Sequence, residues 1–359
     1  MATIKRYLIL GCGGYIGSHL LDRLLDSDDI QIHGWDIDDR KIQHHLDNSK
    51  FDFHKEDLTT AIQKQSFEDI LKQCDVVIHL AAICNPSHYN TDAVKVIQSN
   101  FIETYPIADL CAKHSKWMMF FSTSEVYGRT LSSYVGDDNY ETQDYFELRE
   151  DQTPMIMGPT QNQRWSYACA KQLSERYIYG LHSQYDMPFT IIRPLNFFGS
   201  RMDFLPGRDG EGIPRVLACF MQALMDNEPI QLVDGGHVYR TITAIEDAID
   251  AIILMLNKPD KSQNEIFNIG HQGNEITIKE LAHKMRNIYA DLIGDETIRD
   301  HAIVDVSAAE FYGEGYEDSD RRYPNVSKAK DKLGWVAKTS LDNILKNTVR
   351  YFHEHYKKS

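Results

Sequence analysis

Short, continuously apolar segments alternate with helix-like stretches through the first half of this chain. The apolar segments lie at residues 7–10, 30–36, 74–82, 117–124 and 189–196. The helix-like stretches include residues 15–25, 61–73, 93–115 and 163–184. Strands that are apolar along their whole length are buried on both faces, and such strands separated by helices indicate a parallel sheet. The sequence therefore predicts an α/β fold, a doubly wound parallel sheet.

Three glycines directly follow the first predicted strand and open the first predicted helix. Gly11, Gly14 and Gly17 form the pattern G-x-x-G-x-x-G. Glycine lets the backbone turn tightly and approach a pyrophosphate, whose charge is favoured at the N-terminus of a helix. Asp36 ends the next strand 19 residues after Gly17, the spacing of an acid that binds a ribose. The pattern predicts a Rossmann-type fold that binds NAD, since a carboxylate at this position repels the additional phosphate of NADP.

The second half of the chain has a different character. Residues 201–214 are rich in glycine, proline and charge and predict a long loop, and short mixed elements follow it. At 359 residues, the length favours two units. We expect residues 1–195 to form the NAD-binding domain. We expect residues 196–359 to form mainly a smaller substrate-binding lobe, with some segments returning to the sheet.

The composition excludes several classes of function. The net charge is −15, from 38 Lys and Arg against 53 Asp and Glu, which disfavours a general nucleic-acid or membrane-surface binder. No secretory signal is visible, and no apolar run approaches the roughly 18 residues of a membrane span. The six cysteines are scattered without a CxxC pair, which argues against a disulfide framework or a zinc site. We expect a cytoplasmic protein without a metal.

A tyrosine and a lysine stand four residues apart in a predicted helix. This spacing places Tyr167 and Lys171 on one helix face, where the ammonium would lower the pKa of the phenol. A tyrosinate beside a nicotinamide takes a proton from a sugar hydroxyl while hydride leaves the carbon. Hydroxyls of Thr123 and Ser124, at the end of a strand, could hold the same sugar hydroxyl. A surface lysine beside a half-buried tyrosine is the alternative interpretation.

Several motifs together resemble a known superfamily. The glycine pattern is joined by HLAA at 79–82, Asn100, STSEVYG at 122–128, YACAK at 167–171 and RPLNFFG at 193–199. In these motifs the chain is similar to the extended short-chain dehydrogenases/reductases. That resemblance implies a Rossmann fold, tightly held NAD, a nucleotide-sugar substrate and oxidation at the sugar 4-position.

Further segments narrow the resemblance. LAAICNPSHYNT, QNQRWSYACAKQL, RMDFLPGRDG and EFYGEGYEDSDRR closely resemble the plant UDP-apiose/UDP-xylose synthases. They resemble less closely the decarboxylase domain of the bifunctional polymyxin-resistance enzyme. Both groups imply UDP-glucuronate as the substrate. Oxidation of its 4-hydroxyl creates a ketone β to the 6-carboxylate, and a β-keto acid readily loses carbon dioxide.

The resemblance also implies roles for individual residues. The catalytic set is Tyr167, Lys171, Glu125, Arg322, Thr123, Ser124 and Cys84. The cofactor-binding set is Gly11, Gly14, Tyr15, Ile16, Gly17, Asp36, Asp57, Leu58, Leu80, Ala81, Ala82, Asn100, Tyr167 and Lys171. The substrate-binding set is Cys84, Tyr89, Thr123, Ser124, Glu125, Arg164, Asn196, Arg215, Arg240, Tyr316 and Arg322. Taken alone, Asp57 is also typical of a helix cap. An arginine rarely gives up a proton, so we interpret Arg322 as the anchor of the sugar carboxylate.

The cysteine pattern leaves the product open. The plant synthases carry a cysteine at the position of Cys84 and a second one where this chain has Ser124. Ring contraction to apiose needs a base, which a thiolate supplies near neutral pH and a serine hydroxyl does not supply unaided. UDP-xylose, a UDP-4-keto-pentose and UDP-apiose therefore all remain candidate products. A small buried hydrophobe is the alternative interpretation of Cys84.

Other functions also stay open at this point. The enzymatic alternatives are a 4-epimerase or a 4,6-dehydratase acting on another nucleotide sugar. A non-enzymatic NAD-binding protein is disfavoured because Tyr167 and Lys171 are both present. The resemblance implies a homodimer formed through the helix of Tyr167 and the helix near 93–115.

Overall fold

The computed structural model describes residues 4–135, 142–210, 212–312 and 317–357. Its centre is a seven-stranded sheet with the order β12-β7-β5-β4-β1-β2-β3, in which every neighbouring pair is parallel. The strands are β1 (Lys5–Leu10), β2 (Ile30–Asp36), β3 (Phe51–Lys55), β4 (Val76–His79), β5 (Trp117–Phe121), β7 (Phe189–Pro194) and β12 (Glu265–Ile269). The predicted doubly wound parallel sheet is confirmed.

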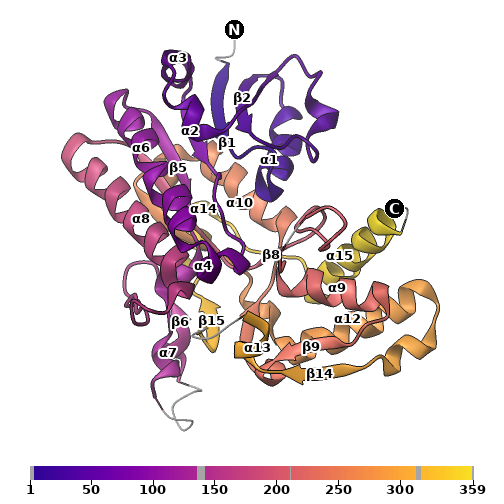
Figure 1. The fold of residues 1–359 in the computed structure, drawn as a ribbon. Helices are drawn as coiled ribbons and strands as arrows, with labels where there is room; N and C mark the ends of the chain where they lie inside the picture. Colours follow the sequence, from indigo (N-terminus) through magenta and orange to yellow (C-terminus); the bar gives the residue numbers. More distant parts are fainter. Residues whose placement is uncertain (1–3, 136–141, 211, 313–316, 358–359) are drawn as a thin grey trace.

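Helices cover both faces of this sheet, as Figure 1 shows. One face packs against α1 (Tyr15–Leu25), α10 (Ile245–Asn257) and α14 (Ser327–Leu333). The other face packs against α3 (Gln65–Gln73), α6 (Thr104–Lys113) and α8 (Ser166–Tyr185). Because both faces are buried, the strands are apolar along their length, which is the pattern seen in the sequence.

The smaller lobe has a core of its own. It is built from α9 (Val216–Asp226), β9 (Ile230–Val233), α12 (Ile278–Ile293), β14 (Ile303–Val306) and α15 (Leu341–Tyr356). A capping box of Thr277 and Glu280 begins α12, and Gly294 at φ +70° ends it. In Figure 1 this lobe lies beside the sheet. None of the helices in the described ranges is long and apolar enough to cross a membrane.

A second, four-stranded sheet positions two arginines. Its order is β13 (Glu275–Thr277), β10 (Tyr239–Thr241), β15 (Arg321–Pro324) and β6 (Glu147–Leu148). β10 and β15 are parallel, and their register pairs Arg240 with Arg322. The two guanidinium groups are therefore held side by side on one face of this sheet.

Two predicted segments differ in detail. The stretch at 93–115 is not one regular helix, since α5 (Ala93–Ile97) passes into a π-helical turn at Gln98–Ile102 before α6 begins. The stretch at 61–73 is divided between α2 (Leu58–Ala61) and α3. The predicted loop at 201–214 contains neither helix nor strand in its described residues.

Candidate active site

The turn between β1 and α1 needs a glycine because the backbone packs closely there. Gly11 has a φ of +87°, and a Cβ atom there would lie 2.5 Å from the backbone nitrogen of Ala81. Within the described ranges, no side chain caps the N-terminus of α1. Its first backbone N–H groups thus suit the pyrophosphate of a dinucleotide, so the residues present fit NAD.

Asp36 supports this turn from the end of β2. Its Oδ2 accepts a hydrogen bond from the backbone of Gly13 at 2.8 Å, and its Oδ1 accepts one from Asp38 at 3.0 Å. Burial raises the pKa of Asp36, and the backbone hydrogen bonds oppose that shift. The carboxylate therefore shapes the turn, and its predicted contact with a ribose stays a prediction.

A cavity of about 480 Å³ opens at the carboxyl ends of the central strands. In a doubly wound sheet this is where ligands bind. Most of the predicted residues line it, namely Gly11, Gly14, Tyr15, Ile16, Gly17, Leu80, Ala82, Cys84, Tyr89, Thr123, Ser124, Glu125, Tyr167, Lys171, Asn196, Arg215 and Arg322. The fold thus brings the cofactor, catalytic and substrate sets together in one cavity.

Tyr167 and Lys171 lie on the face of α8 that borders this cavity. The ring of Tyr167 stacks on that of Tyr89, with the ring centres 5.1 Å apart and the planes at 10°. The Tyr89 hydroxyl donates to the carbonyl of Cys84 at 3.0 Å. Lys171 is buried, and its Nζ donates to the carbonyl of Phe121 at 2.9 Å. These contacts fix the orientation of the phenol and the ammonium group.

The electrostatics of this pair differ from the sequence prediction. Burial raises the pKa of Tyr167 well above 10, and the nearby Cys84 and Glu125 raise it further, while a hydrogen bond with Thr123 opposes the shift. Burial also lowers the pKa of Lys171 to about 8. The predicted lowering of the phenol pKa by the lysine is not seen here, because desolvation outweighs it. The phenol is therefore protonated at neutral pH in this structure.

A buried cluster of charges forms another wall of the cavity. Glu125 Oε2 lies 2.6 Å from Arg164 Nη1, and Glu125 Oε1 lies 3.6 Å from Arg322 Nη1. Asp318 Oδ2 lies 2.5 Å from Arg240 Nη2, and its other oxygen is paired with Arg322. Three guanidinium groups thus surround two carboxylates. Arg322 is not part of a surface ion pair, because its side chain is only 6% exposed.

The arginines hold both carboxylates in the ionised state. Burial by itself would raise the pKa of Glu125, but the charges of Arg164 and Arg322 outweigh it and the pKa lies below its usual value. The same balance, with Arg240 as the strongest cation, holds the pKa of Asp318 well below its usual range. The cluster is therefore charged at neutral pH, and Arg322 presents a cation to the cavity.

Comparison with known proteins identifies the family. Residues 7–270 match the NAD dependent epimerase/dehydratase family, and this segment is most of the chain. The chain belongs to this family. The UDP-D-apiose/UDP-D-xylose synthase 1 of Arabidopsis thaliana is 43% identical over 358 residues, which cover 97% of this chain and 91% of the relative. The UDP-D-apiose/UDP-D-xylose synthase of Oryza sativa subsp. japonica is 42% identical over 361 residues, or 98% and 90% of the two chains.

Solved structures share the fold of this epimerase/dehydratase family member. The PbgP3 protein from Burkholderia pseudomallei matches with a TM-score of 0.83 and 28% identity, covering 99% of this chain and 98% of that one. UDP-glucuronic acid 4-epimerase from Bacillus cereus, in complex with UDP-glucuronic acid and NAD, matches with a TM-score of 0.77 and 22% identity over 98% and 100%. The resemblance stated from the sequence is confirmed.

Two predicted substrate residues lie behind the cavity wall. Arg164 is buried beneath Glu125, with its guanidinium 5.2 Å from the centre of the Tyr89 ring. Arg240 donates to the carbonyls of Tyr239 and Ser319 as well as to Asp318. In this structure both arginines position carboxylates of the charged wall, Arg164 by pairing with Glu125 and Arg240 by pairing with Asp318. Tyr316 lies outside the described residues.

Besides Asp36, four predicted cofactor residues do not line the cavity. Asp57 caps α2 by accepting from the backbone of Thr59 at 2.8 Å, and Leu58 is the first residue of that helix. Ala81 lies against the glycine turn. Asn100, in the π-helical turn, donates to the carbonyl of Ile83 at 2.9 Å and so supports the cavity from behind. The capping interpretation of Asp57 therefore describes its contacts here.

Sequence reasoning missed part of the cavity lining. These residues are Ile83, Asn85, His88, Phe121, Pro194, Phe197, Met202, Asp203 and Phe204. Asp203 has the clearest role, since its Oδ2 accepts from the backbone nitrogen and the Nε of Arg215 at 2.9 and 3.2 Å. The segment RMDFLPGRDG, already singled out by the resemblance, was the signal that could have pointed to Met202, Asp203 and Phe204.

Replacing Asp318 with asparagine is expected to make the free energy of unfolding less dependent on pH in the acidic range. Removing one partner of a buried ion pair should lower the free energy of unfolding by about 3 kcal/mol at pH 7. Because the folded-state pKa of Asp318 lies below its ordinary value of 3.8, this stabilisation is complete above that value and is lost as the pH falls. The difference from wild type, measured by urea unfolding, should shrink below about pH 4.

Asp320→Asn is the matched control for that experiment. Asp320 lies in the same segment, and among the described residues it takes part in no ion pair. Its replacement should change the free energy of unfolding little at either pH. A difference between Asp318→Asn and wild type that stayed constant from pH 7 to pH 3 would contradict the assigned electrostatics.

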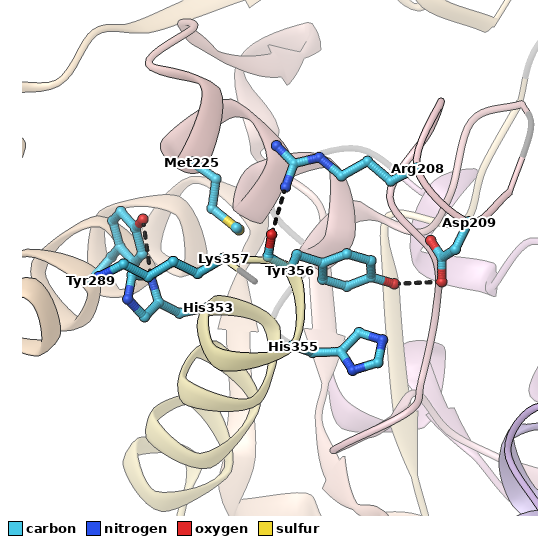
Figure 2. Close-up of a pocket in the computed structure, with 8 residues that line it drawn as sticks. All are labelled: Arg208, Asp209, Met225, Tyr289, His353, His355, Tyr356 and Lys357. Atoms are coloured by element: carbon cyan, nitrogen blue, oxygen red, sulfur yellow. Dashed lines mark hydrogen bonds between the residues drawn. The ribbon is translucent and has the colours of Figure 1, made fainter. Parts of the chain in front are cut away.

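A second, larger cavity of about 880 Å³ lies in the smaller lobe and contains none of the predicted residues. Figure 2 shows the end of α15 against the 201–214 loop, where the Tyr356 hydroxyl donates to Asp209 at 2.7 Å. On the other side, Arg40 donates to the carbonyl of Asp209 at 3.2 Å. The loop that carries Asp203 is therefore fastened to both parts of the molecule.

Proposed function

We propose that this chain binds NAD and UDP-glucuronate, oxidises the sugar at its 4-position and releases the 6-carboxyl group as carbon dioxide. The observation that carries the proposal is that Tyr167, the glycine turn and Arg322 line one cavity. The identity of about two in five residues with the plant UDP-D-apiose/UDP-D-xylose synthases, over nearly the whole chain, supports it.

The cavity supplies a group for each part of the first step. When bound, NAD accepts the hydride from carbon 4 of the sugar and can return it. The Tyr167 hydroxyl is the group that takes the proton of the 4-hydroxyl, and Thr123 is hydrogen-bonded to it. Lys171 lies one helical turn further along the same face, where its ammonium would stabilise the phenolate that forms when the tyrosine passes on its own proton. Residues 1–195 would hold NAD by this arrangement.

The second step depends on the charged wall. Arg322 is the anchor for the 6-carboxylate, because a guanidinium binds a carboxylate through two parallel hydrogen bonds. Glu125 holds Arg322 and Arg164 in place and is positioned to orient a water that protonates carbon 5. Arg215, kept in the cavity by Asp203, supplies positive charge for the diphosphate, and Asn196 lines the same region. Residues 196–359 would thus mainly bind the sugar nucleotide.

A homodimer through α5, α6 and α8 is part of the proposal. α8 packs beside α5 and α6, and several large apolar side chains on these helices are exposed. They include Val94 at 70%, Leu173 at 47%, Tyr179 at 56% and Tyr185 at 63% exposed. These exposed apolar side chains would be available to pack against a second copy.

Nuclear magnetic resonance of the products formed from UDP-glucuronate and NAD tests the function directly. We expect release of carbon dioxide together with UDP-xylose, UDP-4-keto-pentose or UDP-apiose. Inversion at carbon 4 without loss of carbon dioxide would instead identify a 4-epimerase. Absence of any reaction with this substrate would overturn the proposal.

Cys84 is expected to influence the product and not the oxidation. It is exposed and lines the cavity, so its thiol is accessible to a bound sugar. Cys84→Ser should lower the share of UDP-apiose, because a serine hydroxyl is a far weaker base, while UDP-xylose is still formed. Ser124→Cys, which restores the second cysteine of the plant synthases, should raise that share. The product ratio from nuclear magnetic resonance measures both effects.

Cys169→Ser is the matched control, since Cys169 is also exposed but does not line the cavity. Its product ratio should equal that of wild type. An unchanged ratio in both Cys84→Ser and Ser124→Cys would remove the thiols from the ring-contraction step.

A further inference from the structure

Two histidines and an aspartate meet on one face of the central sheet, away from the cavity. His33 lies on β2, and Asp52 and His54 lie on the edge strand β3. The two strands are parallel neighbours whose register pairs His33 with Asp52. Since residues two apart on a strand share a face, Asp52 and His54 both point to the side occupied by His33.

The ligand atoms of these three side chains converge. Asp52 Oδ2 lies 3.2 Å from His33 Nδ1 and 3.2 Å from His54 Nε2. The three groups can each offer an atom within 4.8 Å of the others. Zinc bonds of about 2.0–2.2 Å directed to the corners of a tetrahedron separate the ligand atoms by about 3.4 Å. The two Asp52–histidine distances are already close to this separation, and the imidazole nitrogens lie within 4.8 Å of each other.

The surroundings favour a cation with an open coordination position. The His54 ring stacks on Trp35, with the ring centres 3.7 Å apart and the planes at 8°, which restrains its orientation. The Asp52 side chain is 54% exposed, whereas His33 is 17% exposed. Solvent thus reaches the carboxylate side of the cluster, where a water could complete four ligands.

A second cluster of similar composition provides a contrast. Asp22 Oδ1 lies 3.0 Å from His44 Nε2 and 2.7 Å from His45 Nε2. Its other oxygen, however, is 2.5 Å from the guanidinium of Arg201, which already supplies a positive charge. In the part of the chain that the structure describes, Asp52 forms no ion pair with a lysine or arginine.

We propose that His33, Asp52 and His54 form a binding site for a divalent transition-metal ion of the zinc type. Two imidazoles and a carboxylate are a ligand set that zinc accepts. The ion would join β3 to β2 and so stabilise the edge of the sheet, separately from the proposed reaction. The expectation of no metal rested on the cysteine pattern, which cannot reveal histidines that two strands bring together.

Equilibrium dialysis of metal-free, full-length protein against zinc ions tests the site. We expect about one zinc bound per chain and a rise in the melting temperature on zinc addition. Asp52→Asn keeps the size of an exposed side chain, so folding is not at risk, and it should weaken binding at least about 10-fold and abolish the rise. His33→Gln should do the same.

His44→Gln is the matched control, because it removes one histidine from the Asp22 cluster. This variant should bind zinc as wild type does. The proposal is overturned if wild type binds no zinc, if Asp52→Asn binds it as tightly as wild type, or if His44→Gln is the variant that loses it. Measured in the absence of nucleotide sugar, none of these outcomes depends on the proposed reaction.

Discussion

Replacement of Tyr167 by phenylalanine is expected to lower the turnover of UDP-glucuronate by about 10³-fold, the usual contribution of a positioned acid–base group. The phenyl ring retains the stacking on Tyr89, so the cavity and the binding of NAD should persist. Carbon dioxide release and the absorbance of NADH measure turnover, and calorimetric titration with NAD measures binding. We therefore expect this variant to lose turnover while its affinity for NAD stays close to that of wild type.

Tyr177→Phe provides the matched control on the same helix. The Tyr177 hydroxyl donates to Asp109 at 2.6 Å, away from the cavity. Its removal should leave turnover close to that of wild type. If Tyr167→Phe retained full turnover, the phenol would have no part in removing the proton of the 4-hydroxyl.

Replacement of Arg322 by lysine is expected to slow carbon dioxide release by about 10²-fold, with a smaller effect on oxidation at carbon 4. Lysine keeps the charge but lacks the planar, two-pronged geometry that positions a carboxylate, and a displacement of about 1 Å carries a penalty of this size. A single-turnover experiment that follows NADH and carbon dioxide together should therefore show NADH forming ahead of the gas.

Arg321→Lys is the control for this experiment because the two arginines are adjacent on β15. Arg321 pairs with Glu275 at 2.6 Å, outside the cavity, and packs over the ring of Phe146. Lysine at this position should leave both rates nearly unchanged. Equal slowing of oxidation and carbon dioxide release in Arg322→Lys would show that the arginine does not act specifically on the carboxylate.

Most strands and helices of the central sheet could be predicted, because the apolar pattern of each segment is visible in its own sequence. The helix Tyr15–Leu25 and the strand Ile30–Asp36 occupy the ranges that the apolar pattern predicted. The π-helical turn at Gln98–Ile102 was not predictable, because its hydrogen bonds depend on tertiary contacts. Asn100 within this turn accepts from Ser174 on α8 through its carbonyl, and that packing is decided by the whole fold.

In the candidate site, too, features set by local sequence could be predicted and features set by tertiary contacts could not. Motifs that follow strands, such as the glycine turn and STSEVYG, reach the cavity because parallel strands end at one edge of the sheet. Asp318 was not singled out although it lies four residues before Arg322, because the choice of ion-pair partners is settled by distant strands. For the same reason, the ion pairs of Arg164 with Glu125 and of Arg240 with Asp318 were not predicted, and the expected contacts of these arginines with substrate stay predictions.

The position of β12 in the central sheet limits how chimeras of related proteins can be designed. β12 covers the outer edge of β7, although the two strands are separated by the whole of α9 and α10. A fragment ending near residue 195 would leave β7 with an unprotected edge that invites intermolecular pairing. Chimeras that exchange specificity between relatives should therefore transplant the segments on either side of Glu265–Ile269 and keep this strand with its original partner.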